Sequence, residues 1–130
     1  MVQGPEIGLT GVVTAAVRVE DTAMALGSGD VEVLGTPRVL ALMEAACLAA
    51  LAGRLPEDRT SVGSRVHLEH VYPAVVGAPV VATATLVSVQ GRALRFDVAV
   101  LDADERVLAH GSLARVVVDR ARFGTRGAGA

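Results

Sequence analysis

Aromatic residues and cysteine are scarce in this chain, and their scarcity excludes several kinds of function. Aromatics make up 2% of the 130 residues, and Tyr72, Phe96 and Phe123 lie far apart, so no stacking platform for single-stranded nucleic acid is expected. The single cysteine, Cys47, has no disulfide partner within the chain, and its place in an apolar run indicates a packing role. One cysteine and three separated histidines form no ligand cluster, so we expect no metal site.

Lysine is absent, and the twelve basic residues are arginines scattered along the chain. With a formal net charge of −2 and no basic stripe to follow a phosphate backbone, nucleic acid is not an expected partner. The N-terminus has no basic start followed by an apolar stretch, which makes the cytoplasm the expected compartment. The apolar run 36–53 is interrupted by Glu44 and closed by Gly53 and Pro56, so a membrane span is not expected either.

Small aliphatic residues are abundant, because 52% of the chain is hydrophobic despite the lack of aromatics. A chain of 130 residues can bury a sizeable core, which here must be built from Val, Leu and Ala. We find no internal repeat and expect one domain over residues 1–123. The segment 120–130, RARFGTRGAGA, has the composition of a loose tail, and 124–130 are expected to be a flexible C-terminal tail.

The order of the predicted elements indicates an α+β fold. A strand is predicted over 10–19 and a helix over 36–53, with Thr36 as its N-cap, Pro37 at the first helical position and Gly53 near its end. Apolar residues wrap almost fully round this helix, which predicts burial on most sides. Strands follow over 61–72, 78–90, 93–102 and 106–118, the last three as an antiparallel meander. This is the element order of the hotdog fold, an antiparallel sheet wrapped around a long central helix.

Glu44 is the most unusual residue of the helix, because it is a carboxylate among apolar neighbours without an opposite charge one turn away. Partial desolvation would suit a general base, and removal of the charge is then expected to leave folding intact or to improve it. The alternative is that Glu44 reaches solvent or bonds a backbone group or a partner subunit. The helix alone does not decide between these interpretations.

Period-two alternation along SVGSRVHLEHVY, residues 61–72, divides the polar residues of this strand between two faces. The predicted core face carries Val62, Ser64, Val66, Leu68, His70 and Tyr72. His70 is therefore expected to point at the helix, where it could meet Glu44, with a core histidine bonded to a backbone carbonyl as the alternative. His67 falls on the polar face between Arg65 and Glu69, and His110 is expected to be structural.

Two roles that do not exclude each other are open to Thr36 at the helix start, and capping alone is the commoner one. Its hydroxyl caps the helix, and the backbone N–H groups beside it can bind a carbonyl oxygen that becomes anionic. Thr36 and Glu44 are eight residues apart, so their bearings around the helix differ by about 80° and both can border one pocket. No phosphate-binding loop and no serine hydrolase elbow is present in the sequence.

Four segments together resemble the fluoroacetyl-CoA thioesterase family of hotdog proteins: GTPRVLALMEAAC, SVGSRVHLEH, SVQGR at 88–92 and GSLARVVV. The resemblance runs from about residue 10 to 123 and implies thioester hydrolysis of an acyl-CoA substrate, with no cofactor beyond the CoA of the substrate. By the same resemblance Thr36, Glu44 and His70 correspond to the catalytic residues, and Gly63 and Arg115 to positions that contact substrate or CoA. Glu44 would act as nucleophile or as general base. A homodimer or a dimer of dimers is also implied.

The chain departs from the family before and within the helix. The family's namesake carries aromatic residues there that cover a fluorinated acyl group, whereas MALGSGDVEVLGTPR contains no aromatic residue. We therefore expect a small or medium acyl group without selectivity for fluoroacetate. The competing interpretation is a non-catalytic module that binds acyl-CoA. A hotdog dehydratase is not favoured, because no Asp-x-x-x-x-His stretch is present.

Overall fold

The computed structural model describes the backbone of residues 3–129 and the side chains through residue 124. Its elements are β1 (Thr10–Ala16), a short 3-10 turn (Val19–Asp21), α1 (Ala23–Leu26), α2 (Thr36–Ala50), β2 (Arg59–His70), β3 (Pro79–Gln90), β4 (Ala93–Asp102), β5 (Val107–Asp119) and α3 (Arg120–Gly129). The five predicted strands and the long helix are confirmed. The prediction of a loose segment from residue 120 is wrong, since α3 occupies it.

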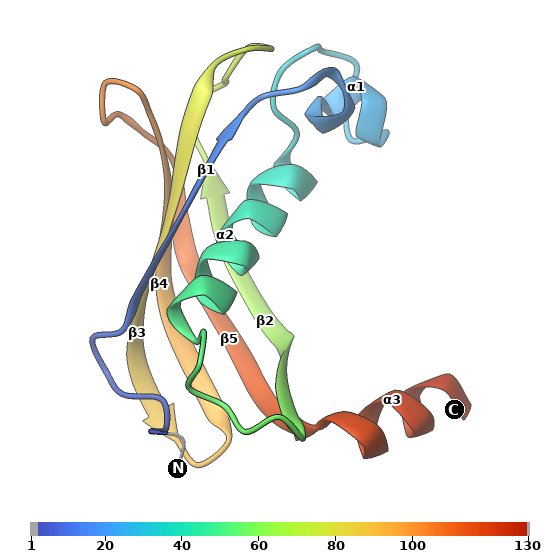
Figure 1. The fold of residues 1–130 in the computed structure, drawn as a ribbon. Helices are drawn as coiled ribbons and strands as arrows, with labels where there is room; N and C mark the ends of the chain where they lie inside the picture. Colours follow the sequence, from blue (N-terminus) through green and yellow to red (C-terminus); the bar gives the residue numbers. More distant parts are fainter. Residues whose placement is uncertain (1–2, 130) are drawn as a thin grey trace.

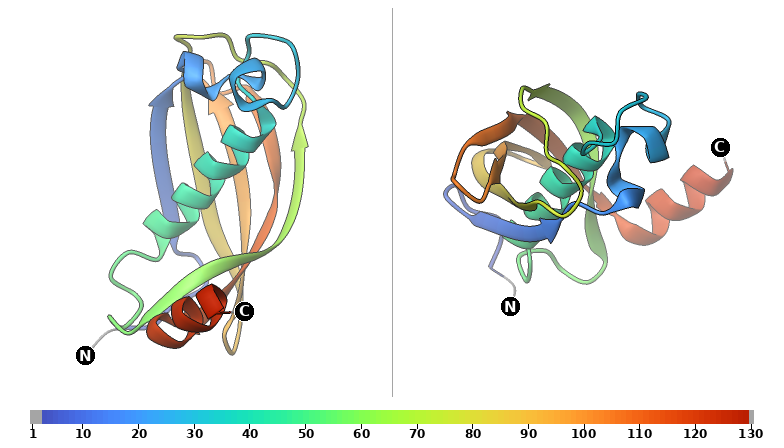
Figure 2. Two further views of the ribbon diagram at one scale, coloured as in Figure 1. Left: turned by 90° about the vertical axis from the view of Figure 1, so that its right-hand side faces the viewer. Right: turned by 90° about the horizontal axis from the view of Figure 1, so that it is seen from above.

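The strands form one sheet in the order β1-β3-β4-β5-β2, and every neighbouring pair is antiparallel. The predicted meander is β3-β4-β5, and β1 and β2 are the two edges of the sheet. The sheet curves around α2, which lies along its concave face (Figures 1 and 2). The expected α+β arrangement of a sheet wrapped around a helix is therefore confirmed.

The core lies between α2 and the sheet. Buried residues of α2 pack against buried residues of the strands, including Val39, Leu42, Met43, Ala46, Cys47, Leu86, Phe96 and Leu113. At Gly11 on β1 an added Cβ would lie 2.0 Å from the carbonyl oxygen of Ala46 and 2.5 Å from the nitrogen of Ala50. Only glycine lets the helix backbone approach β1 this closely.

Only one side of α2 is covered, and this corrects the expectation of a helix buried on most sides. Ala41, Leu48 and Ala49 are exposed, with 49% of Leu48 accessible. The reason is geometric, because a single curved sheet covers the helix from one direction and α2 contacts β1 and β3 far more than β2. An apolar strip of the helix beside β2 is left open. Among the described residues, no helix combines the length and apolarity needed to cross a bilayer.

Candidate active site

Strand β2 contains a β-bulge that changes which of its residues face α2. Gly63 pairs with Arg115 and Arg65 pairs with Ala114, so Ser64 is an extra residue without a partner. The bulge shifts the alternation of side chains by one residue. The predicted assignment of faces is therefore correct only after the bulge, where His70 points to the helix. Before the bulge the prediction is wrong: the residues that face α2 are Ser61 and Gly63, not Val62 and Ser64.

Tyr72 also departs from the predicted core face. It lies beyond the end of β2 and is 48% exposed, with the guanidinium of Arg106 4.9 Å above its ring. The alternation rule does not apply there, because the chain has already left the sheet at His70.

The start of α2 joins Thr36 to His70. Thr36 is the first helical residue, Gly35 is the N-cap, and no side chain caps the helix, so the predicted capping role of Thr36 is wrong. Its Oγ1 instead forms a 2.9 Å hydrogen bond with Nδ1 of His70. The helix start also offers fewer free N–H groups than expected. Pro37 has no N–H, and the N–H groups of Arg38 and Val39 both donate to the carbonyl oxygen of Gly35. The Thr36 N–H has no acceptor among the described residues.

Burial controls the charge of His70. Desolvation lowers the pKa of its imidazole, and the backbone of Tyr72 acts in the opposite direction with a smaller effect. Nε2 is buried and has no hydrogen-bond partner within the described part of the chain. The ring is therefore favoured in its neutral form at neutral pH, with one nitrogen fixed by Thr36 and the other unpaired.

The middle of α2 joins Glu44 to Arg115 of β5. Nη1 of Arg115 donates to Oε2 of Glu44 at 3.1 Å, while Nε and Nη2 donate to the hydroxyl and the carbonyl of Ser61, both at 2.9 Å. The side chain of Arg115 is 7% exposed and that of Glu44 is 36% exposed. Glu44 therefore has the charged partner that its helix lacks, and its desolvation is smaller than the helix alone suggests.

Gly63 leaves space for this carboxylate. A Cβ at residue 63 would lie 2.8 Å from Oε2 of Glu44 and 3.8 Å from Nη1 of Arg115. Ser61 accepts two of the three hydrogen bonds that the guanidinium of Arg115 donates. It was missed in the sequence because uninterrupted alternation puts it on the outer face. The glycine inside the strand was the available signal, since such a glycine often marks a bulge or a close approach.

The predicted residues thus form two pairs on one side of the sheet, Thr36 with His70 and Glu44 with Arg115. Thr36 and Glu44 are about 12 Å apart along the helix axis. The sequence left a contact between His70 and Glu44 possible, but no hydrogen bond or ion pair joins them among the described residues. The pairs can act together only on a group placed between them.

The other ionisable residues singled out in the sequence lie elsewhere. His67 is exposed, and Nε2 of His110 lies 3.5 Å from Glu69. Cys47 is fully buried, and desolvation raises the pKa of its thiol to about 12, so it remains protonated. Within the described residues, no three His, Cys, Asp or Glu side chains come together as a metal-ligand set.

Comparison with known proteins places the chain in a family. The model of the fluoroacetyl-CoA-specific thioesterases matches residues 17–121. The fluoroacetyl-CoA thioesterase of Streptantibioticus cattleyicolor is 32% identical over 95 residues, which cover 73% of this chain and 68% of that protein. A solved structure of a fluoroacetyl-CoA thioesterase superposes with a TM-score of 0.88 at 27% identity, covering 95% of this chain and 96% of the other. A hot-dog-like protein from Thermanaerovibrio acidaminovorans superposes with a TM-score of 0.82 at 28% identity, covering 92% and 88%. The chain therefore belongs to the family of fluoroacetyl-CoA-specific thioesterases and has the hotdog fold.

Proposed function

We propose that the protein hydrolyses acyl-CoA thioesters with a small or medium acyl group, using Thr36, Glu44 and His70. The observation that supports this most directly is the Glu44 carboxylate. It is held at 3.1 Å from a buried guanidinium and stands on the same side of the sheet as the Thr36–His70 pair. A carboxylate in a fixed position and a neutral imidazole, both facing the same space, are groups that general acid–base or nucleophilic catalysis uses.

In the proposed mechanism, the thioester carbonyl lies between the two pairs. The N–H and hydroxyl of Thr36 stabilise the negative charge that develops on the carbonyl oxygen. Glu44 attacks the carbonyl carbon directly or removes a proton from the water that does so, and His70 takes part in proton transfer to the departing CoA sulfur. In the direct route the C–S bond breaks, CoA leaves, and the acyl group stays on Glu44 as a mixed anhydride that water then hydrolyses. In the other route the activated water forms the new C–O bond as the C–S bond breaks, so both routes end with a carboxylic acid and free CoA. Arg115, Ser61 and Gly63 fix the position of the Glu44 carboxylate.

The acyl group we propose is aliphatic rather than fluorinated. Residues 24–38, which lead into α2 and form its first turn, contain no aromatic side chain. Apart from the charged residues Asp30, Glu32 and Arg38, the side chains of this segment are small or aliphatic, and they suit a plain acyl chain. The activity and the selectivity are tested together by measuring release of free thiol from a panel of substrates. The panel runs from acetyl-CoA and fluoroacetyl-CoA to medium-chain and aromatic acyl-CoA.

We also propose that the protein is a homodimer or a dimer of dimers. Strand β2 is an unpaired edge, and Val66 on its helix-facing side is 49% exposed, as is Leu48 on the open strip of α2. Pairing of two β2 edges would cover both side chains. Light scattering should give at least twice the 13.3 kDa of one chain at micromolar concentration. A mass near 13.3 kDa over a whole dilution series would contradict it. A cytoplasmic location stays a prediction of the sequence.

The competing function is a module that binds acyl-CoA without turnover. Calorimetry and the thiol assay together separate a binding module from a thioesterase. Tight binding of an acyl-CoA without thiol release from any member of the panel favours the binding module. Glu44→Gln, purified in the same way, is the matched control, since it keeps the shape of the side chain and removes its charge. Thiol release by the wild type and not by Glu44→Gln supports hydrolysis at this site.

A further inference from the structure

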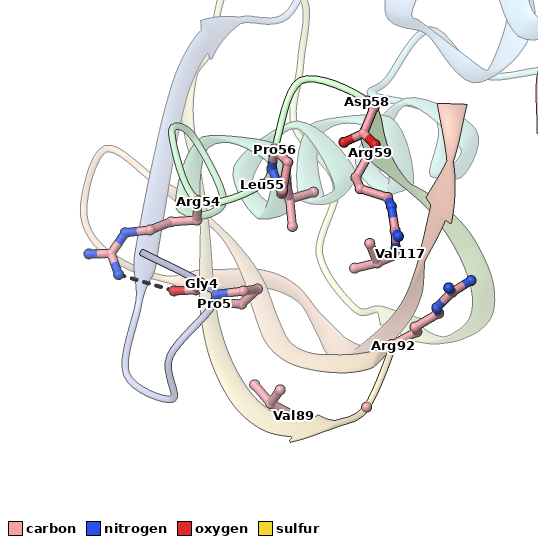
Figure 3. Close-up of a pocket in the computed structure, with 11 residues that line it drawn as sticks. Gly4, Pro5, Arg54, Leu55, Pro56, Asp58, Arg59, Val89, Arg92 and Val117 are labelled. Carbon is pink, nitrogen blue, oxygen red and sulfur yellow. Dashed lines mark hydrogen bonds between the residues drawn. The ribbon is translucent and has the colours of Figure 1, made fainter. Parts of the chain in front are cut away.

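Arginine side chains gather at the end of the molecule where α2 stops. A cavity of about 510 Å³ opens there between the N-terminal segment, the loop after α2 and the turn between β3 and β4 (Figure 3). Its walls include Leu55, Val89 and Val117, and its charged residues are Arg54, Arg59, Arg92 and Asp58. Three positive charges against one negative charge contrast with the net charge of −2 of the chain.

Two of these arginines lack partners among the described residues. Arg54 is turned to the N-terminal segment, with Nη1 3.3 Å from the carbonyl oxygen of Gly4 and 3.9 Å from Glu6. No hydrogen bond or ion pair holds the guanidinium of Arg59 or of Arg92 within the described part of the chain. Figure 3 shows these two side chains on the same side of the cavity, next to Val117, and Arg54 on the opposite side. Val117 also bonds the carbonyl oxygen of Arg92 through its N–H, at 2.9 Å.

A neighbouring cavity lies nearer to the candidate active site. This second cavity, of about 190 Å³, shares Leu55, Pro56 and Arg59 with the first. It also reaches Leu48 on α2 and Ser61 on β2. Ser61 is bonded to Arg115, which holds Glu44. Arg59 lies two residues before Ser61, about 6.6 Å along the strand. The two cavities are therefore neighbours, and together their walls extend from Ser61, which supports Glu44 through Arg115, to the unpartnered arginines.

We propose that Arg59 and Arg92 bind phosphate groups in the nucleotide part of CoA, with the pantetheine arm lying in the smaller cavity beside Leu48 and Leu55. This rests on the proposed acyl-CoA thioesterase function. A guanidinium binds phosphate through two parallel charge-assisted hydrogen bonds, and CoA carries its phosphates at the end remote from the thioester. The smaller cavity combines the apolar residues Leu48, Leu51, Leu55 and Pro56 with polar groups that include Thr60 and Ser61. This mixed lining suits an uncharged arm that carries both methylene groups and amides.

The test compares an acyl-CoA substrate with the same acyl group on pantetheine, which has no phosphate. Arg59→Gln and Arg92→Gln should each raise KM for acyl-CoA roughly tenfold, with kcat unchanged, because one charge-assisted interaction is lost. Arg92→Gln should leave KM for acyl-pantetheine unchanged, because Arg92 lines only the larger cavity, away from the proposed place of the arm. Arg95→Gln is the matched control, since it removes the same charge from β4 outside both cavities and should leave both substrates unaffected. Added salt should raise KM for acyl-CoA only.

Equal effects of Arg92→Gln on the two substrates, or no effect of either substitution on acyl-CoA, would overturn the assignment. Failure of the wild type to release thiol from both substrates would instead refute the proposed function. The site is then tested by calorimetry with CoA, adenosine 3′,5′-bisphosphate and inorganic phosphate as probes. Weaker binding of CoA and adenosine 3′,5′-bisphosphate to Arg59→Gln and Arg92→Gln supports the phosphate site. The site is refuted if neither substitution changes the binding of these two probes, or if inorganic phosphate binds as strongly as they do.

Discussion

Substitution of Gly63 by alanine should separate catalysis from folding. The added Cβ would stand 2.8 Å from Oε2 of Glu44, and an ordinary contact needs about 3.4 Å, so the carboxylate must move by at least roughly 0.6 Å. That atom is the end of a flexible side chain, which can rotate away at little cost in energy. Its movement disturbs the 3.1 Å bond to Arg115, which sets the position of the carboxylate.

The expected result is a loss of turnover with little change in melting temperature. Misplacement of a catalytic group by about 1 Å can cost about 100-fold in rate, so a shift near 0.6 Å should lower kcat about 10- to 100-fold. Alanine also lowers the conformational entropy of the unfolded chain, which stabilises the fold by about 0.4–1 kcal/mol. This gain offsets part of the stability lost with the contact to Arg115. Thiol release and thermal unfolding by circular dichroism should be measured on the same preparation.

Gly11→Ala is the matched contrast for this experiment. Its Cβ would meet the backbone of Ala46 at 2.0 Å and of Ala50 at 2.5 Å, and a helix backbone cannot rotate away. Gly11→Ala should therefore lower the melting temperature strongly, because α2 must separate from β1. Wild-type kcat in Gly63→Ala would refute the reasoning, since it would mean that the chemistry does not depend on where the Glu44 carboxylate lies.

Three further predictions follow from the same contacts. Glu44→Gln should lower turnover by about 10² to 10⁴ and, contrary to the expectation from the helix alone, should also lower the melting temperature, because the buried guanidinium of Arg115 loses its charged partner. An unchanged melting temperature would show that this pair contributes nothing to stability. His70→Ala should reduce turnover strongly and His67→Ala should not, as judged by thiol release from folded variants; similar losses would mean that the faces of β2 are misassigned. Burial lowers the pKa of His70 below 6.5, so the unfolded chain takes up a proton at a higher pH than the folded chain. The free energy of unfolding should therefore fall as the pH drops below 6.5, by at most about 1.4 kcal/mol per pH unit, until the folded-state pKa is reached. His70→Asn should remove this part of the pH dependence in urea titrations, and an unchanged dependence would contradict the assignment.

The fold could be predicted because local signals mark its elements. Pro37 and Gly53 delimit α2, and Gly91 lies in the turn of the β3–β4 hairpin with a φ of 60°. The helix over 120–129 was not predicted, because its composition of arginine, glycine and alanine resembles a linker. The open side of α2 was also missed, since an apolar pattern reports what should be covered but not which element covers it.

The candidate site could be predicted only in part, because its contacts join residues far apart in the chain. Glu44 and Arg115 are separated by 71 positions, and Thr36 and His70 by 34. No local pattern pairs such residues, and the resemblance to a family provided their roles. Ser61 escaped both approaches, since the bulge at Ser64 reverses the alternation on which the assignment of faces rested.

The separation of the two pairs leads to a last prediction about how they cooperate. No hydrogen bond or ion pair links Thr36 to Glu44 among the described residues, so Thr36→Val and Glu44→Gln should change the free energy of unfolding additively. If both residues act on one carbonyl in one transition state, their effects on kcat should not multiply, and the double variant should be little slower than the slower single variant. A double-mutant cycle on kcat and on urea unfolding measures both couplings with the same four proteins. Losses in kcat that multiply fully would contradict the mechanism, because they would place Thr36 and Glu44 in independent roles.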